Sequence, residues 1–324
     1  IKGKRMYSKK LTDLLGEARK PGTEYEQRHK DIAATLQYMV EKSLIQTARH
    51  AVKTTGKRNL CMAGGVFLNC VANQKILELP EVDNIFVQPG AGDAGGSVGA
   101  AFFVWNQILD HNRSFEMKHA YFGPDFTDRE IKAALHKNKL IFNELSDEEL
   151  LATTVQRIAQ GRTVGWFQGR LEFGPRALGN RSILADARKP EMVDVLNHRI
   201  KHREWFRPFA PLVKEEKANE YFEMKNLSPF MLLAPLVKPD KRGIIPAVTH
   251  IDGTARVQTV SKETNPRLWS LLDVFEKETG VPVIINTSFN LKGEPIVCTP
   301  EEAINDYLKS EMDCLVLGNC FIEK

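Results

Sequence analysis

The sequence predicts an α/β protein built from two consecutive parts. In the first part a short strand, a glycine-containing loop and a helix follow one another twice, at residues 59–79 and 84–109. In the second part short apolar runs alternate with segments that carry helix-capping signals. A polar, irregular stretch at residues 110–127 separates the two, so we expect one domain over 1–120 and another over 121–324. Strand–loop–helix units of this kind place ligand-binding loops at the ends of strands.

The elements follow from periodicity and capping. An amphipathic helix is expected over residues 31–53, with one face carrying Ile32, Leu36, Met39, Val40 and Leu44. Helix starts are expected at Thr127 with Glu130, at Ser146 with Glu149, and at Thr299 with Pro300 and Glu302. Strands are expected at residues 162–167, 230–237, 256–260, 281–287 and 314–317. These elements predict a mixed sheet with one helical layer in the second part.

Composition excludes several classes of protein. The 324 residues are 42% hydrophobic and 27% charged, and no apolar run approaches the roughly 20 residues that span a bilayer. The five cysteines form no CxxC pair, so neither a zinc knuckle nor a disulfide framework is indicated, and we expect a reducing, cytoplasmic location. The chain opens at Ile1 without a signal peptide, which suggests a fragment with further sequence upstream.

Basic charge is concentrated in one segment. Residues 162–207 hold eight arginines and two lysines against five acids, an excess of five in a chain whose net charge is only +4. A generic nucleic-acid-binding protein would spread its basic residues over a broad face, so nucleic acid is not expected as a partner. Arginine is suited to bidentate recognition of phosphate or carboxylate, and the segment therefore predicts an anion pocket.

The glycine-rich residues 89–99 contain two misleading patterns. A dinucleotide fingerprint would need a second strand ending in an acid, and a GxSxG nucleophile would need a strand directly before Ser97, which we place in a helix. Asp93 is instead a candidate metal ligand, with a simple loop or N-cap role as the alternative. Residues 63–69 permit close backbone approach to a nucleotide through Gly64, Gly65, Val66 and Asn69, although packing alone would explain the glycines equally well.

Three polar segments of the second part carry the candidate site. Residues 168–182 hold Arg170, Arg176 and Arg181 between Gly and Pro residues, which indicates an anion clamp with Glu172 orienting one arginine. Residues 197–208 extend the basic region, and there His198 and His202, four apart on an expected helix, favour phosphate contacts over half a metal site. Residues 286–294 place amides and hydroxyls after a buried strand, with a plain turn as the alternative.

These segments together resemble the carbamoyltransferases of the nodulation-protein and antibiotic-biosynthesis type. The motifs are EFGPRALGNRS at 172–182, REWFRPFAP at 203–211 and NTSFNLKGEP at 286–295, with GGVFLNCVAN at 64–73 and GAGDAGGSVGAA at 90–101. The resemblance implies part of an actin-like ATPase lobe over 1–120, followed by a YrdC-like α/β domain over 121–324. It further implies that carbamoyl phosphate and ATP form carbamoyl adenylate, whose carbamoyl group passes to a hydroxyl of a small-molecule acceptor with help from a divalent metal, Fe or Mg. The family's metal-binding histidines lie in a region that this chain lacks.

The resemblance and the residues together give the expected roles. The catalytic candidates are Arg176, Arg181, Ser288 and Asn290. The candidates for substrate and phosphate binding are Arg170, Glu172, Gly174, Gly179, Ser182, Asn197, His198, Lys201, Arg203, Arg207 and Asn286. A homodimer is compatible with the sequence. The alternatives are a threonylcarbamoyl-type enzyme of tRNA modification and a nucleotide-sensing module without catalysis; aromatic residues Trp166, Phe167, Trp205 and Phe206, which we expect in the core, argue against the first.

Overall fold

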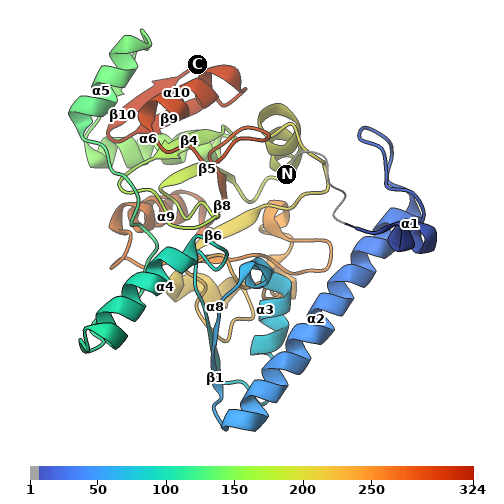
Figure 1. Cartoon of the computed structure of the whole chain (residues 1–324). Coiled ribbons are helices and arrows are strands. Elements are labelled where there is room, and N and C mark those ends of the chain that lie inside the picture. Colours follow the sequence, from blue (N-terminus) through green and yellow to red (C-terminus); the bar gives the residue numbers. More distant parts are fainter. Residues whose placement is uncertain (1–6) are drawn as a thin grey trace.

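The second part of the chain forms an eight-stranded mixed sheet. The computed structural model describes residues 7–324 (Figure 1). The strands lie in the order β3 (Asn143–Glu144), β10 (Cys320–Glu323), β9 (Cys314–Leu317), β4 (Val164–Phe167), β5 (Arg181–Asp186), β8 (Val283–Ser288), β6 (Ala210–Lys214) and β7 (Gln258–Val260). The β4–β9 and β6–β7 pairs are parallel and the others antiparallel, so the expectation of a mixed sheet is confirmed.

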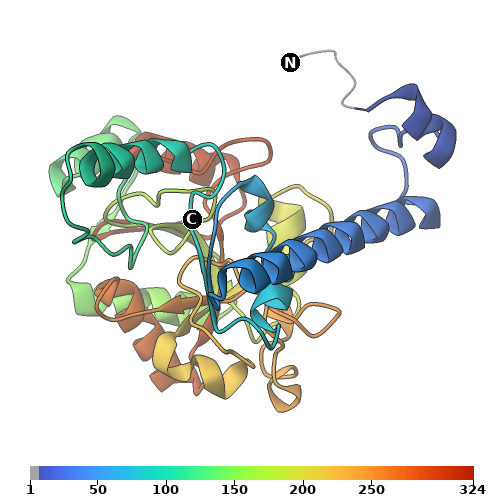
Figure 2. The ribbon, with the colours of Figure 1, turned by 60° about the horizontal axis from the view of Figure 1, so that its bottom comes forward.

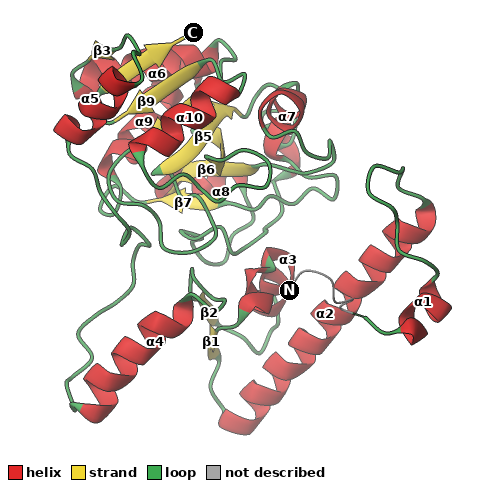
Figure 3. Ribbon diagram, turned by 45° about the horizontal axis from the view of Figure 1, so that its top comes forward, coloured by secondary structure: helices red, strands yellow, loops and turns green. Residues whose placement is uncertain are grey.

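Helices cover both faces of this sheet, so the expectation of a single helical layer was wrong. One face packs against α6 (Asp147–Ala159) and α9 (Pro266–Thr279). The other packs against α5 (Asp128–Lys137), α10 (Pro300–Lys309), α8 (Ala218–Tyr221), and α7 (Met192–Asp194) with the π-helical turn η3 (Val195–Ile200). Short 3₁₀ turns lie at Glu215–Lys217, Pro239–Lys241 and Pro246–Val248. Figure 3 shows the strands enclosed by helices.

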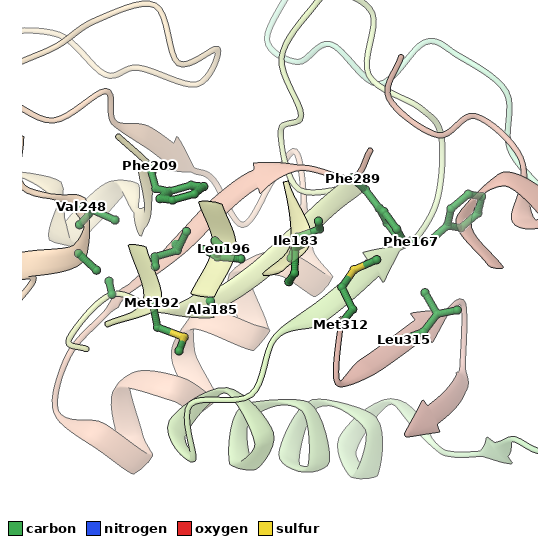
Figure 4. Close-up of a cluster of buried hydrophobic side chains, with 14 of the residues drawn as sticks. Phe167, Ile183, Ala185, Met192, Leu196, Phe209, Val248, Phe289, Met312 and Leu315 are labelled. Carbon is green, nitrogen blue, oxygen red and sulfur yellow. The ribbon is translucent and has the colours of Figure 1, made fainter. Parts of the chain in front are cut away.

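The reason for two layers is visible in single strands. In β5, Ile183 and Ala185 join the cluster under α10, whereas Leu184 between them joins the cluster under α9. Side chains alternate across a sheet, and here both sets are apolar, so both faces must be covered. Figure 4 shows Ile183 and Ala185 with Phe167, Phe289 and other members of the first cluster.

The first part is smaller and less enclosed. It contains α1 (Lys9–Leu15), α2 (Gln27–Thr55), β1 (Asn59–Met62), η1 (Gly65–Leu68), α3 (Cys70–Leu77), β2 (Asn84–Val87), α4 (Gly95–Phe103) and η2 (Val104–Ile108). Strands β1 and β2 pair in parallel as a two-stranded sheet. Helix α2 is long and extends beyond the rest of the molecule (Figure 2). Leu36 and Met39, on its predicted apolar face, are 64% and 50% exposed.

The two parts share a hydrophobic cluster. Met62, Ile76 and Val87 of the first part pack in it with Leu178 and Leu232 of the second. Polar contacts add to this joint: Asn73 Nδ2 donates to Leu232 O at 3.0 Å, and the Tyr121 hydroxyl donates to Leu178 O at 3.0 Å. The polar stretch at 110–127 therefore connects two parts that pack on a common core.

The helix caps, which depend on residues close in sequence, were predicted correctly, whereas several strands were not. The capping boxes at Thr127, Ser146 and Thr299 are all confirmed, and Ser97 lies inside α4. The expected strand at residues 230–237 is wrong: these residues form bends with isolated bridges, and Met231 has a left-handed φ of 55°. Strands β3, β5, β6 and β10 were not predicted.

Candidate anion-binding site

A polar pocket of about 320 Å³ opens where two of the predicted segments meet. One wall follows the η3 turn, and the other is the loop after β8. Its lining residues are Lys201, Arg203, Glu204, Arg207, Ser288, Asn290, Leu291, Lys292 and Gly293. The structure thus brings five predicted site residues together from positions more than 80 apart in the sequence.

Lys201 lies at the base of the pocket with 4% of its surface exposed. Its Nζ donates to Asn290 O at 2.9 Å, to Asn290 Oδ1 at 2.8 Å, to Ser288 Oγ at 3.3 Å, and to Ser288 O. All of these acceptors are uncharged. Burial, followed by repulsion from Arg203, lowers the pKa of Lys201 to about 7, while Asp306 opposes this shift. Lys201 therefore organises the loop and changes its charge near neutral pH.

The backbone of residues 196–203 determines how Lys201 and Arg203 are oriented toward the pocket. The Lys201 amide donates to Leu196 O at 2.9 Å, which is the wider hydrogen-bonding step of a π-helical turn. His202 follows with a left-handed φ of 45° and ends the helical path. Asn197 is buried and accepts from Arg203 Nε at 2.7 Å, so it orients Arg203 from behind the pocket. Burial lowers the pKa of Arg203 to about 10.

The structure does not form a metal site from the histidine pair. His202 lies outside the π-helical turn that carries His198, so the expected helical spacing of four is lost. His198 is exposed and lies 4.0 Å from Asp194. Across residues 7–324 there is no group of three His, Cys, Asp or Glu side chains that could hold a metal ion.

A second basic group lies behind the arginine motif. Arg176 donates to Leu68 O at 3.1 Å, and the charges of Arg176 and Arg203 both repel that of Arg256. Burial lowers the pKa of Arg176, and burial with repulsion from Arg176 lowers that of Arg256 to about 10. Within the described residues, no carboxylate lies at ion-pair distance from Arg176, Arg203 or Arg256, and Nε of Arg176 and of Arg256 has no partner. All three are half-buried. Partly desolvated cations without a counter-charge are costly, and a bound anion would neutralise them.

Arg256 was missed at the sequence level. It lies just before β7, within residues 256–260, for which the sequence predicts a strand and no site residue. Its neighbours Arg176 and Arg203 are 80 and 53 positions away in the sequence, so no local pattern identified it. We name Arg176, Arg203 and Arg256 the arginine cluster.

Arg181 does not face this pocket, which corrects its expected role. It is completely buried, and its guanidinium donates to Gln168 O at 2.7 Å, Asn180 O at 2.9 Å and Gly169 O at 3.0 Å, over the Phe167 ring. Burial lowers its pKa to about 10. Arg181 therefore ties the loop to strand β4 from the inside.

Arg170 and Glu172 also hold backbone. Arg170 donates to Gly123 O at 2.9 Å and to Phe122 O at 3.1 Å, which anchors the connecting stretch. Glu172 was expected to orient an arginine, but its Oε1 accepts from the amides of Leu178, Asn180 and Arg181. Burial raises the pKa of Glu172. The carboxyl group thus shapes the 172–182 loop and does not form an ion pair with an arginine.

The remaining residues of these segments pack the loop. Gly174 has a φ of 122°, and a Cβ there would lie 2.6 Å from Pro89 O, so the arginine loop touches the glycine-rich loop of the first part. The Gly179 amide donates to Ser182 Oγ at 3.0 Å. Asn286 is buried and donates to Gln258 Oε1 at 2.7 Å. Gly174, Gly179, Ser182 and Asn286 therefore support the site from outside the pocket.

The glycine loops of the first part lie against each other. The Gly64 amide donates to Ala91 O at 2.7 Å, and Gly65 lies opposite Gly92. Val66 is 45% exposed, whereas the Asn69 side chain caps α3 by accepting from the Ala72 amide at 3.1 Å. These contacts support the packing interpretation of the glycines, and only Val66 presents a free side chain. 

Asp93 is exposed in the turn before α4. As the one metal-ligand candidate of the glycine loops, it does not amount to a metal site within the described part of the chain. The described residues therefore do not provide the ligands of a metal site by themselves.

The fold and the pocket define an α/β protein with a polar pocket lined by lysine and arginine side chains. Residues 155–324 match the family described as "Carbamoyltransferase C-terminus", and residues 1–102 match "Carbamoyltransferase N-terminus". The chain belongs to the carbamoyltransferase family.

Three relatives show the extent of the match. An uncharacterised protein of Synechocystis, sll1178, is 45% identical over 99% of this chain and 57% of its own length. Nodulation protein NolO of Bradyrhizobium diazoefficiens is 41% identical over 95% of this chain and 57% of its own. Nodulation protein NolNO of Sinorhizobium fredii is 42% identical over 95% and 46%. The chain spans about half the length of these relatives.

A solved structure is more distant. The crystal structure of full-length HypF in the phosphate- and nucleotide-bound form is 22% identical, with a TM-score of 0.35 over 51% of this chain and 20% of that one. This likeness is too low to support an argument about function. Among the described residues, no helix is long and apolar enough to cross a membrane.

Proposed function

We propose that the pocket binds carbamoyl phosphate and ATP and forms carbamoyl adenylate, whose carbamoyl group then passes to a hydroxyl of a small-molecule acceptor. The observation that carries the proposal is the arginine cluster without carboxylate partners beside a pocket based on Lys201. Membership of the carbamoyltransferase family supplies the reaction class. A phosphate-bearing substrate is the ligand that such a set of cations stabilises best.

The chemistry balances without a protein nucleophile. Water releases phosphate from carbamoyl phosphate and leaves carbamate. A carbamate oxygen then attacks the α-phosphorus of ATP, the bond to the β-phosphate oxygen breaks, and pyrophosphate leaves. The acceptor hydroxyl finally attacks the carbamoyl carbon and releases AMP. Positioning and positive charge are the contributions that phosphoryl transfer requires from the protein.

Specific residues have roles in this scheme. Arg203 and Arg207 at the pocket wall, with Arg176 and Arg256 behind it, neutralise phosphate oxygens. Lys201 supplies a buried cation and holds Ser288 and Asn290, whose polar atoms orient the carbamoyl group or the α-phosphate. Arg181 supports the loop and makes no contact with the substrate.

Pyrophosphate exchange tests the proposal. Labelled pyrophosphate should enter ATP only when carbamoyl phosphate is present. Arg176→Ala should abolish this exchange, because the anion loses a half-buried partner, whereas Arg199→Ala, an exposed arginine outside the pocket, should keep it. Exchange at the wild-type level in a folded Arg176→Ala protein would refute the role of Arg176, and absence of exchange in the unmodified chain would refute the reaction.

The exposure of two aromatic side chains favours an alternative function, tRNA modification. Trp166 and Phe167 are buried as expected, but Trp205 and Phe206 are 68% and 51% exposed, contrary to the expectation that all four lie in the core. Exposed aromatic rings beside a basic pocket can stack on nucleic-acid bases. Binding of tRNA with a steep salt dependence would favour threonylcarbamoyl-type tRNA modification, and its absence would leave the small-molecule acceptor.

The non-catalytic alternative has a separate readout. A nucleotide-sensing module would bind ATP in calorimetry but release no pyrophosphate when carbamoyl phosphate is added. Pyrophosphate release under the same conditions excludes it.

A further inference from the structure

The anion pocket contains an acid to which the proposed chemistry gives no role. Among the described residues that line the pocket, Glu204 carries the only carboxylate, beside the cations of Lys201, Arg203, Arg207 and Lys292. A negative charge in this position repels a phosphate group and lowers the affinity of the site. A residue with this cost is expected to make a contact that the correct ligand offers and a wrong ligand lacks.

The Glu204 carboxylate is held on one side and open on the other. Arg207 Nε lies 2.9 Å from Glu204 Oε2, and the Arg207 amide donates to Glu204 O at 3.2 Å, so the turn fixes both residues. The ion pair is not aligned as a hydrogen bond, and within residues 7–324 no donor reaches the covered Oε2. Oε1 accepts no side-chain hydrogen bond in the described part of the chain and is not covered. A ligand in the pocket can therefore reach free lone pairs on Oε1.

Glu204 can act only as an acceptor at neutral pH. Its own backbone amide, and then the charges of Arg207, Lys292 and Arg203, lower the pKa of Glu204. The carboxyl group is therefore ionised, and an ionised carboxylate accepts hydrogen bonds without donating any. The ligand group that lies against it must carry N–H or O–H bonds.

The acceptors on the other wall of the pocket are already in use. Asn290 Oδ1 accepts from Lys201 Nζ at 2.8 Å and from Ser288 Oγ at 2.7 Å. Asn290 O accepts from the same lysine at 2.9 Å, and Ser288 O accepts from it as well. Of the described side chains that line the pocket, Glu204 is therefore the strongest acceptor that is still available.

A carbamoyl group matches this arrangement because its NH₂ group carries two donors. We infer that Glu204 is the residue that selects the carbamoyl donor: its carboxylate accepts from the NH₂ group while Arg203 and Arg207 hold the phosphate. An acetyl group has a methyl in the same place, so it would leave the carboxylate desolvated and unpaired, and the site would reject it. The identity of the substrate in this assignment rests on the proposed function.

Two stable analogues that differ in a single group test the assignment. Phosphonoacetamide and acetonylphosphonate have the same size and the same phosphonate, but the first ends in NH₂ and the second in a methyl group. Calorimetry at pH 8 measures the dissociation constant of each for the whole chain, without ATP and without turnover. The wild type should bind phosphonoacetamide about 10- to 100-fold more tightly, the range for a hydrogen bond to a charged group.

Matched variants separate selection from a structural role. Glu204→Ala should bind the two analogues within about threefold of each other, and Glu204→Gln, which keeps an uncharged acceptor, should retain a preference of about threefold to tenfold. Lys292→Met removes a cation of the same pocket and should weaken both analogues by the same factor, which leaves the preference unchanged. If Glu204 only held Arg207, its removal would also change both dissociation constants equally. A preference that persists in Glu204→Ala, or a wild type without one, would overturn the assignment.

The assignment and the proposed function have separate readouts. A preference that Glu204→Ala abolishes, together with absent pyrophosphate exchange, would support Glu204 as the selecting residue and refute the formation of carbamoyl adenylate. Normal exchange together with a preference that Glu204→Ala retains would refute the role of Glu204 alone. Binding of neither analogue to the folded wild type would refute both.

Discussion

At the scale of single residues, the site combines cations that have no ion-pair partner within residues 7–324 with one that has: Arg207 pairs with Glu204 at 2.9 Å. Lys201 is held by neutral oxygens, and the arginine cluster has no carboxylate partner among the described residues. A protein that carries such a group gives up stability for the ability to bind an anion.

Anion binding should weaken as the pH rises through about 7. Above the lowered pKa of Lys201, the free protein must take up a proton before that lysine can stabilise an anion, so the affinity should fall by up to tenfold per pH unit. Sulfate is a suitable probe because its own charge is constant from pH 6 to 9. Calorimetry should show this fall for the wild type and a flatter profile for Lys201→Arg, in which the cation does not titrate.

Arg256→Met should stabilise the free protein and weaken anion binding. Removal of this half-buried cation relieves its repulsion with Arg176 and Arg203, and we expect a gain of about 1–2 kcal/mol in the free energy of unfolding. The stabilisation by added pyrophosphate should shrink at the same time, since one partner of the anion is lost. Thermal unfolding with and without pyrophosphate measures both effects, and Arg199→Met is the control. An undiminished pyrophosphate effect would show that Arg256 does not contact the anion.

At the scale of elements, the 172–182 loop is a rigid support. Glu172 gathers three backbone amides, and Arg181 binds carbonyl groups on the opposite side. The sequence motif predicted a clamp of three arginines. In the structure, the guanidinium group of Arg181 lies in the core and that of Arg170 binds the stretch that connects the two parts. Only Arg176 belongs to the arginine cluster.

Gly179→Ala should destabilise the chain strongly. Gly179 has a left-handed φ of 100°, and an added Cβ would lie 2.1 Å from Leu268 Cδ2 of helix α9. We expect a loss of about 2–4 kcal/mol from backbone strain and overpacking together. Gly96→Ala is the matched control, because Gly96 lies inside α4 with no neighbour near its Cβ position, and alanine there should be neutral or slightly stabilising. Urea unfolding compares the two, and equal midpoints would contradict this reading of the loop.

At the scale of the whole molecule, the two parts share one cluster of buried side chains. Leu178, Met231 and Leu232 of the second part complete the core beneath the two-stranded sheet of the first. Arg176 and Gly174 contact the first part at the same boundary. The pocket's support is therefore expected to respond to changes in the first part.

Leu232→Ala should loosen both parts together. Its buried side chain belongs to the shared cluster, and its truncation should cost about 2–4 kcal/mol. Hydrogen exchange should rise in strand β2 as well as around residue 232. Leu272→Ala, in the separate cluster under α9, should cost a similar amount without a selective rise in β2. A local effect of Leu232→Ala on the second part alone would contradict a shared core.

The local elements and the segments that hold the site could be predicted from the residues alone. Helix caps at Thr127, Ser146 and Thr299 could be predicted because each depends on groups only three residues apart. The segments after η3 and β8 could be identified because clusters of arginines, amides and hydroxyl groups indicate a binding site. Their resemblance to carbamoyltransferases is confirmed by the family match.

Which of those side chains face one another could not be predicted, because it depends on how distant segments pack. Whether an arginine points into a pocket, like Arg203, or into the core, like Arg181, depends on strands that pair over long distances in the chain. The same pairing covers both faces of the sheet and brings Arg256 to the arginine cluster. The energy of a buried charge depends on its neighbours in space, and those neighbours are not adjacent in the sequence.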